Sequence, residues 1–409
     1  MTPSTTSADG KLKTMNVYGL ASVAEMLDDS IVYRNLIPLD GRLPGFRDLA
    51  KRVGIDGRRV PRKSEPDYAR VMVEVLHNAR ALGGEPTRLQ RLIFIGDTRL
   101  NDGTAFANLC RAGGWPGIAF IGSEADAPEQ LEILAEDDRI MLLANRWAML
   151  ADLDRICRER GLAIDAGTAI VLDLDKTTLG ARGRNDRVID AARVTAVRET
   201  VASLLGSDFD APRFETHYTL FNQTQFHPFT TDNQDYLAYL CLILGSDLIS
   251  ATDLADAILS GRLAHFSDFL EQVEGAAAGL PEQLRSLHAE IYSLVKAGDP
   301  TPFKAFRYNE YLATVKRMGH LPSDAPVARR LVEEIVITQE VRSCALDWRS
   351  RGALLFALSD KPDEASVPNK EQMQLGYAPI HRTPTHAVGA SNTDTDHRPG
   401  GEPPCSSAI

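Results

Sequence analysis

The feature that most constrains this chain is a short apolar run that ends directly in acidic and hydroxyl side chains. Residues 169–172 (AIVL) lead into Asp173-Leu174-Asp175-Lys176-Thr177-Thr178. A short, wholly apolar run is typical of a strand buried on both faces of a parallel α/β sheet. Ligands of open α/β sheets bind at the carboxyl ends of such strands. In an extended chain Asp173 and Asp175 would point the same way, and two adjacent carboxylates are costly unless a cation or a proton relieves them. For this motif alone, a surface Asp-x-Asp turn is the alternative.

A second apolar run ends in a similar way. Residues 92–95 (LIFI) are followed by Gly96-Asp97, and Asp102 comes near the start of a helix predicted over 102–112. Asp97 can present an oxygen to a hard cation, and an acid at position 102 suits the positive end of a helix. The Gly-Asp…Asp pattern is weak alone, because acids often cap helices after strands. Together with the first motif it becomes specific.

With two further motifs, the chain resembles the haloacid dehalogenase superfamily. An apolar run over 353–358 ends at Ser359, like the strand-end Ser/Thr of that family. Lys63 precedes an amphipathic helix predicted over 66–83, like the family's phosphate-binding lysine. The resemblance covers roughly residues 40–125, 165–195 and 335–390.

The order of the motifs departs from the family. The family usually runs Asp-x-Asp, Ser/Thr, Lys, Gly-Asp, whereas this chain runs Lys63, Asp97, Asp173, Ser359. A circular permutation would give this order and leave spatial neighbours intact. The resemblance therefore implies an α/β fold with a Rossmann-like parallel sheet of the haloacid dehalogenase type, permuted strand order and a mostly helical cap insertion. The site would close either within one chain or across a homodimer.

The resemblance also assigns catalytic roles. Asp173 would be the nucleophile that forms an aspartyl-phosphate, and Asp175 the general acid and then the base. Asp173, Asp175 (through its backbone carbonyl) and Asp97 would hold Mg²⁺, and Asp102 would orient these ligands from behind.

Other residues are expected to contact the phosphoryl group or the rest of the substrate. Thr177, Ser359 and Lys63 would donate to phosphoryl oxygens. For Ser359 the alternative is a helix N-cap, and Lys51 and Arg62 lie close to Lys63 in the sequence. Arg182 and Arg184 follow the Asp-x-Asp strand and either meet the charged part of the substrate or are solvated loop arginines.

The leading hypothesis is a Mg²⁺-dependent phosphohydrolase acting on a small phosphorylated metabolite. Another reaction of the superfamily, such as phosphotransfer or dehalogenation, is an alternative. A dehalogenase would not need Asp175 or Asp97. A non-catalytic protein-binding module with the same fold is the second alternative, and the intact acids argue against it.

The pattern along the chain suggests four parts. Residues 1–14 and 391–409 are predicted to be disordered, 15–207 and 328–390 to form the α/β core, and 208–327 to form the helical cap. Conceivable substrate contacts in the cap, each weak alone, are His217, His227, Lys304, Arg307 and His320. Residues 124–138 are predicted to be loop or helix, 328–350 one long amphipathic helix, and 376–389 an edge strand.

Charge and cysteine usage narrow the function class. With 45 Lys+Arg against 56 Asp+Glu, the formal charge is −11, which argues against a general nucleic-acid or acidic-membrane binder. The 5 cysteines have no CxxC spacing and read as reduced. No secretory signal is visible, and the longest apolar stretch, 236–244, is too short to span a bilayer. We therefore expect a cytoplasmic protein.

Overall fold

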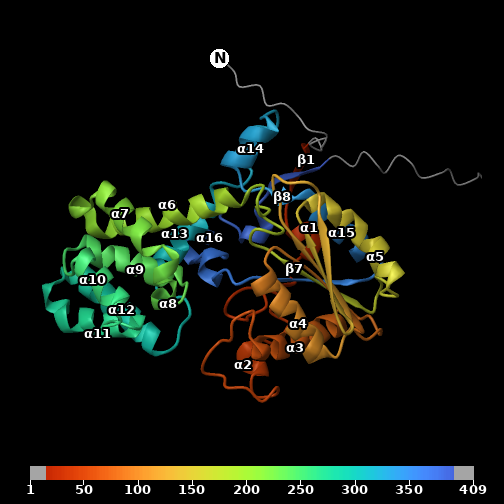
Figure 1. The fold of residues 1–409 in the computed structure, drawn as a ribbon, viewed down its shortest axis with the longest axis horizontal. Helices are drawn as coiled ribbons and strands as arrows, with labels where there is room; N and C mark the ends of the chain where they lie inside the picture. Colours follow the sequence, from red (N-terminus) through yellow and green to blue (C-terminus); the bar gives the residue numbers. More distant parts are fainter. Residues whose placement is uncertain (1–14, 391–409) are drawn as a thin grey trace, which may run out of the picture.

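The computed structural model describes residues 15–390 as a mixed α/β protein with two sheets and a helical lobe (Figure 1). The tails predicted to be disordered, 1–14 and 391–409, lie outside the described residues. Within 15–390, no helix combines the length and apolar character needed to cross a bilayer.

The larger sheet has 7 strands in the order β2-β9-β7-β3-β4-β6-β5. All neighbours are parallel except β5 and β6. The strands are β2 (Ile31–Val32), β3 (Arg91–Gly96), β4 (Gly117–Gly122), β5 (Leu131–Glu136), β6 (Arg139–Ala144), β7 (Thr168–Asp173) and β9 (Leu354–Leu358). Every residue of β7 is buried, as its apolar run predicts. The two acidic motifs therefore end adjacent strands, with Ile95 opposite Leu172.

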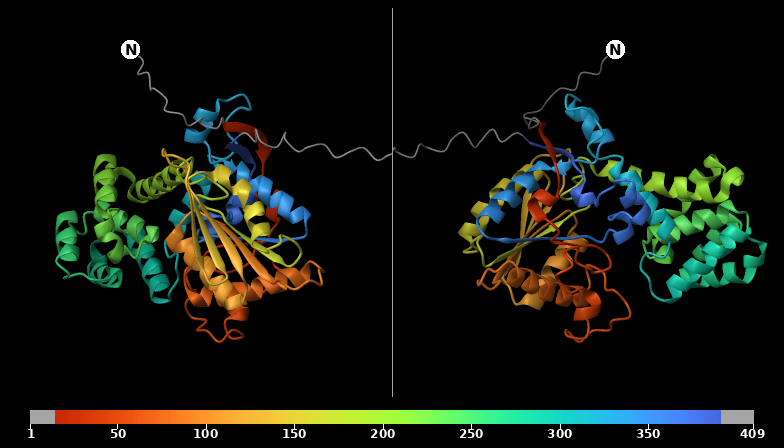
Figure 2. Two further views of the ribbon diagram at one scale, coloured as in Figure 1. Left: turned by 45° about the vertical axis from the view of Figure 1, so that its right-hand side comes forward. Right: turned by 180° about the vertical axis from the view of Figure 1, so that it is seen from behind.

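Alternate residues of these strands pack into separate cores on the two faces of the sheet. Ile170 and Leu172 of β7 belong to one core, and Ala169 and Val171 to the other. One face carries α2 (Phe46–Leu49), α3 (Pro66–Leu82) and α4 (Thr104–Gly113), and the other carries α1 (Ala24–Leu27), α5 (Leu153–Glu159) and α15 (Gln339–Ser350) (Figures 1 and 2). This two-sided cover explains why the central strands are continuously apolar.

A smaller sheet of 3 strands lies beside the first, in the order β1-β10-β8. Its strands are β1 (Met15–Ala21), β8 (Ile337–Thr338) and β10 (Thr385–Ala390). β1 is antiparallel to β10, with Met15 opposite Ala390, and β10 is parallel to β8. The two ends of the described range are thus neighbours.

The helical lobe stands to one side of the large sheet (Figure 1). It contains α7 (Ala211–Phe221), α8 (His227–Thr230), α9 (Gln234–Gly245), α10 (Ala251–Leu259), α11 (Phe266–Ala276) and α12 (Glu282–Lys296). Its core is rich in aromatic rings, and Tyr236 stacks on Phe266 with centroids 3.8 Å apart. Two helices join the lobe to the sheet: α6 (Asp186–Leu205) and α13 (Lys304–Val315) pack together, and Asn309 donates to the Thr200 hydroxyl at 2.7 Å.

Several predicted elements need correction. Residues 124–138 contain strand β5, paired antiparallel with β6, instead of a loop or helix. The long helix predicted over 328–350 is divided into α14 (Val327–Glu333), β8 and α15. The break falls at the β-branched run 335–338 (IVIT), where the Asn185 amide oxygen accepts from the Val336 N–H and β8 pairs with β10. Tertiary pairing here overrides helical periodicity.

The carboxyl-terminal segment also differs from the prediction. The strand predicted over 376–389 is confined to Thr385–Ala390, and a 3₁₀ turn, Ile380–Arg382, precedes it. It was predicted to lie at a sheet edge, but β10 is the middle strand of the smaller sheet, between β1 and β8. A short helix, α16 (Lys370–Gln374), precedes that turn. Strands β1 and β2 were not predicted, because the first has a mixed pattern and little buried surface and the second has only 2 residues.

Candidate functional site

The candidate site is a cavity of about 620 Å³ between the carboxyl ends of the central strands and the helical lobe. It brings together most of the residues singled out in the sequence. Those that line it are Lys63, Asp97, Asp102, Asp173, Asp175, Arg182 and Ser359. They come from four separate segments, and the sheet order places three of these segments side by side.

The chain turns sharply at the end of β7. The Thr178 and Leu179 amides donate to the carbonyls five residues earlier, at 3.3 and 2.9 Å, and Lys176 adopts a left-handed backbone with φ of 67°. The Thr178 hydroxyl also donates to the Asp173 carbonyl at 2.7 Å. The turn ends the strand at Asp173, so the extended alternation expected for the two acids does not continue to Asp175. Both acids line the cavity, but their carboxylates contact different cations.

Asp102 organises the loop that follows β3. One of its carboxylate oxygens accepts from the backbone N–H of Asp97 at 3.0 Å and from the N–H and hydroxyl of Thr98 at 2.9 and 3.0 Å. The loop continues as a π-helical turn, Arg99–Gly103, before α4 begins. A Cβ at Gly96 would lie only 2.5 Å from the Asp102 Cβ. Glycine at position 96 is therefore what lets Asp102 approach the strand end.

Lys63 lies between two of the acids. Its Nζ is 2.7 Å from Asp102 Oδ1 and 2.5 Å from Asp173 Oδ1, and the residue is only 2 % exposed. The ammonium group also lies 5.4 Å from the centre of the Phe94 ring. The lysine thus reaches the Asp-x-Asp strand from a segment 110 residues earlier in the chain.

Three carboxylates form the centre of the site, and we call Asp97, Asp102 and Asp173 the carboxylate cluster. One oxygen from each lies within 4.8 Å of the others. Burial and repulsion from Asp102 raise the pKa of Asp97 to about 7. Burial raises the pKa of Asp173 well above its usual range despite Lys63. Burial alone would raise the pKa of Asp102, but Lys63 outweighs it and lowers that pKa to about 2. The three carboxylates therefore have less positive charge around them than they need.

The cluster fits a small divalent cation. Its donors are all carboxylate oxygens, which Mg²⁺ prefers, and a cation would offset the repulsion that raises two of the pKa values. Arg182 Nε lies 2.5 Å from Asp97 Oδ2 and supplies part of the missing charge. The side chain of Asp175 is outside the cluster, and Asp102 is inside it. Mg²⁺ itself stays a prediction.

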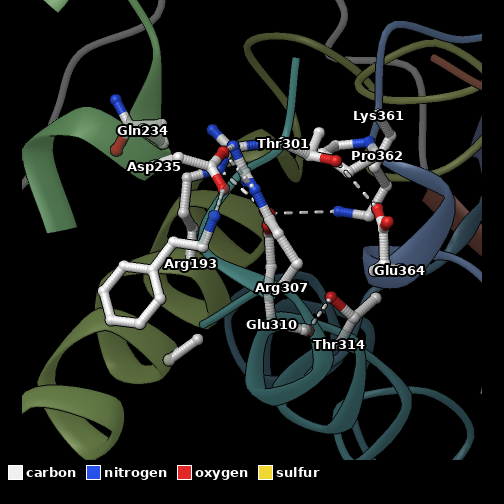
Figure 3. Close-up of polar contacts among 12 residues, drawn as sticks. Arg193, Gln234, Asp235, Thr301, Arg307, Glu310, Thr314, Lys361, Pro362 and Glu364 are labelled. Carbon is white, nitrogen blue, oxygen red and sulfur yellow. Dashed lines mark hydrogen bonds and ion pairs between the residues drawn. The ribbon is translucent and has the colours of Figure 1, made fainter. Parts of the chain in front are cut away.

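A second set of charges lies on the lobe side of the cavity, and we call Arg193, Asp235, Arg307, Glu310 and Lys361 the lobe network (Figure 3). Arg307 is 2.7 Å from Asp235 and 2.5 Å from Glu310. Glu310 also contacts Arg193 at 3.0 Å and Lys361 at 3.4 Å. Burial would raise the pKa of Glu310, but its three cations lower it well below the usual range. This network is closed, since its two carboxylates face three cations.

Two cations of the lobe network, Arg193 and Lys361, contact the second acid of the Asp-x-Asp motif, Asp175. Arg193 Nη2 lies 3.4 Å from Asp175 Oδ2, and Lys361 Nζ lies 3.9 Å from Asp175 Oδ1. Sequence reasoning missed Arg193, Glu310 and Lys361. Lys361 stands two residues after Ser359, which was a usable signal, whereas nothing in the sequence links Arg193 on α6 to Glu310 on α13.

Three of the predicted phosphate or substrate contacts have other neighbours. Thr177 is fully buried, does not line the cavity, and its hydroxyl has no hydrogen-bond partner among residues 15–390. The Arg184 side chain is 4 % exposed, pairs with Glu124 and Glu340 and lies away from the cavity lining. The Ser359 hydroxyl lines the cavity but accepts from the Lys361 N–H at 3.1 Å, as a cap would.

The five candidate contacts in the cap also differ in position. Arg307 lines the cavity, but within the lobe network. The other four are not among the cavity-lining residues: His217, His227, Lys304 and His320. Lys304 instead pairs with Glu364 at 2.6 Å.

Comparisons with known proteins give no relative for this chain. A scan against protein-family models and searches of curated proteins and of solved structures returned no significant match. The function of the protein is therefore inferred from the residues of the cavity and their chemistry.

Proposed function

We propose that this protein is a Mg²⁺-dependent phosphohydrolase and a circularly permuted relative of the haloacid dehalogenase superfamily. The strand order supports the permutation, because β7 with its Asp-x-Asp lies between β3 with Gly-Asp and β9 with Ser359. The pairing of β1 with β10 brings the two ends of the described range together, which is consistent with a permutation.

The observation that carries the proposal is the convergence of the carboxylate cluster and Lys63. These four side chains come from three distant segments, are almost fully buried, and share one cavity. Three buried carboxylates whose negative charge is only partly neutralised destabilise a fold. Binding of a positively charged ligand therefore accounts for their presence better than a contribution to stability does.

By resemblance to the superfamily, the proposed reaction has two steps. An oxygen of Asp173 attacks phosphorus and forms an aspartyl-phosphate, while Asp175 gives a proton to the departing alcohol oxygen. Asp175 then takes a proton from water, whose oxygen attacks phosphorus, releasing phosphate and restoring the Asp173 carboxylate. Lys63 and the Ser359 hydroxyl stabilise charge on the phosphoryl oxygens. Mg²⁺, held by Asp97 and Asp173, would supply the charge that lets an anionic substrate approach an anionic nucleophile.

The test is phosphate release from an aryl phosphate with Mg²⁺. Asp173→Asn is expected to abolish it, because the amide cannot act as the nucleophile. Asp232→Asn is the matched control. Asp232 lines the same cavity, but its side chain is 72 % exposed and its ion pair with His227 is long, at 3.9 Å. Equal activity of D173N and the unaltered protein would overturn the proposal. A folded protein that binds no Mg²⁺ and releases no phosphate would favour the non-catalytic alternative.

A further inference from the structure

The basic residues that line the cavity differ in whether a carboxylate neutralises their charge. Most of the cations that line the cavity have a carboxylate partner. Arg59 pairs with Glu65 at 2.7 Å and Lys176 with Asp190 at 2.8 Å. Lys63 and Arg182 form ion pairs with the carboxylate cluster, and Arg193, Arg307 and Lys361 belong to the lobe network (Figure 3).

Arg34 and Arg62 are the exceptions. Among residues 15–390, neither forms an ion pair with a carboxylate. Arg34 Nη1 donates to the Pro61 carbonyl at 2.9 Å, and Arg62 Nη2 donates to the Thr231 carbonyl of the lobe at 3.2 Å. Both side chains line the cavity. Carbonyl contacts orient a guanidinium without neutralising it, so both keep their charge and further N–H groups for a ligand.

The Arg34 guanidinium contacts the backbone of Pro61, the residue before Arg62, so the two arginines belong to the same part of the cavity wall. Burial lowers the pKa of Arg34, Asp360 opposes this, and the charge of Arg62 lowers the pKa further. An anion between them would relieve this repulsion. Asp360 also lines the cavity, but its carboxylate accepts only weakly, from the Lys63 N–H at 3.4 Å, and offsets one positive charge at most.

The fold fixes this pair relative to the reaction site. Arg34 follows β2, the strand next to β9, and its N–H donates to the Lys361 carbonyl at 3.1 Å. Arg62 is adjacent in sequence to Lys63, whose ammonium contacts Asp173. The pair is therefore tied on one side to the loop of Ser359 and on the other to the residue beside the nucleophile.

We propose that Arg34 and Arg62 form a second anion subsite and that the substrate is a phosphomonoester with a second anionic group, either a carboxylate or another phosphate. This inference rests on the proposed function for the identity of the reacting phosphate. Guanidinium groups bind carboxylates and phosphates alike, through paired hydrogen bonds. The two arginines would therefore select for a second anionic group of either kind.

The first experiment is calorimetric binding of non-hydrolysable phosphonates to the unaltered protein with Mg²⁺. Alkanediphosphonates and phosphonoalkanoates of increasing chain length are compared with alkylphosphonates of the same length. The doubly anionic compounds of the best length are expected to bind about 10- to 100-fold more tightly, the range of charge-assisted hydrogen bonds. The diphosphonate and carboxylate arms identify which second anion is preferred.

Variants then assign the effect to these arginines. Arg62→Gln, at an exposed position that tolerates change, is expected to lower affinity for the doubly anionic compound at least about tenfold and to leave the alkylphosphonate within about twofold. Arg34→Gln should act in the same way, and Asp360→Asn should strengthen binding. Arg59→Gln is the matched control, since that arginine lines the same cavity but is paired with Glu65.

Two results would overturn the subsite: equal affinity for singly and doubly anionic compounds, or an Arg62→Gln variant that leaves their ratio unchanged. These results differ from those expected if the proposed function is wrong. In that case no ester would release phosphate, whereas phosphonate binding tests the subsite without any turnover.

Discussion

The two charged regions of the cavity contain similar residues but differ in their balance. In the lobe network, three cations (Arg193, Arg307 and Lys361) face two carboxylates, Glu310 and Asp235. The pKa of Glu310 is held far below its usual range, although burial raises the pKa of Asp235. In the carboxylate cluster, three carboxylates face only two cations, Lys63 and Arg182. Burial and mutual repulsion raise the pKa values of Asp97 and Asp173, while Lys63 lowers the pKa of Asp102. We infer that the lobe network holds the lobe on the sheet and that the carboxylate cluster, which has too little positive charge, is where a ligand would bind. Buried charge alone does not indicate a functional site, but uncompensated buried charge does.

The largest expected effect comes from opening the closed network. Arg307→Met keeps much of the apolar stem but leaves Asp235 and Glu310 with less positive charge. We expect the free energy of unfolding to fall by about 3–5 kcal/mol, the usual cost of breaking a buried ion pair. Urea denaturation measures it. Arg329→Met, which removes the exposed pair with Glu333, should change stability little. An R307M variant as stable as the parent would refute the structural role.

An intermediate effect is expected from crowding the carboxylate cluster. Gly96→Ala adds a Cβ that would lie 2.5 Å from the Asp102 Cβ, so Asp102 must move from Lys63 and from the Asp97 amide. Overpacking of this kind costs about 1–3 kcal/mol, and phosphate release should also be lost. Gly41→Ala is the control, because no atom lies within 4 Å of its added Cβ. Normal activity in G96A would show that the position of Asp102 does not matter.

A smaller effect concerns pH. Asp97, with a pKa of about 7 in the folded protein against about 3.9 when unfolded, binds more proton in the folded state between those values. Stability of the metal-free protein should therefore fall as pH rises from about 4 to 7, and the contribution of this group should level off above pH 7. Urea denaturation with a chelator, at low and neutral pH, should show the fall in the unaltered protein and a reduced one in Asp97→Asn. Parallel curves would argue against the raised pKa.

The comparison also separates what the sequence could predict from what it could not. The central strands and the ends that carry Asp97, Asp173 and Ser359 follow from apolar runs of strand length. The meeting of Asp97 with Asp173 follows from the rule that ligands gather at the carboxyl ends of parallel strands.

The rest depends on tertiary pairing. The break between α14 and α15 arises because residues 335–338 pair with β10 and Asn185 holds the Val336 amide, and no local pattern encodes those partners. The lobe network joins α6, α9 and α13 to the loop after β9, so it could not be seen before these segments were packed. Arg184 was a candidate substrate contact because it follows the Asp-x-Asp strand in the sequence. In the fold, Glu124 and Glu340 from distant segments neutralise its charge.

The most direct test of the central claim is calorimetric titration of the protein with Mg²⁺ near neutral pH. The open charge of the carboxylate cluster predicts a single Mg²⁺ site, with affinity at least about tenfold weaker in Asp97→Asn and in Asp173→Asn than in the Asp232→Asn control. Absence of binding in the unaltered protein, or equal affinity in all of these variants, would contradict the account.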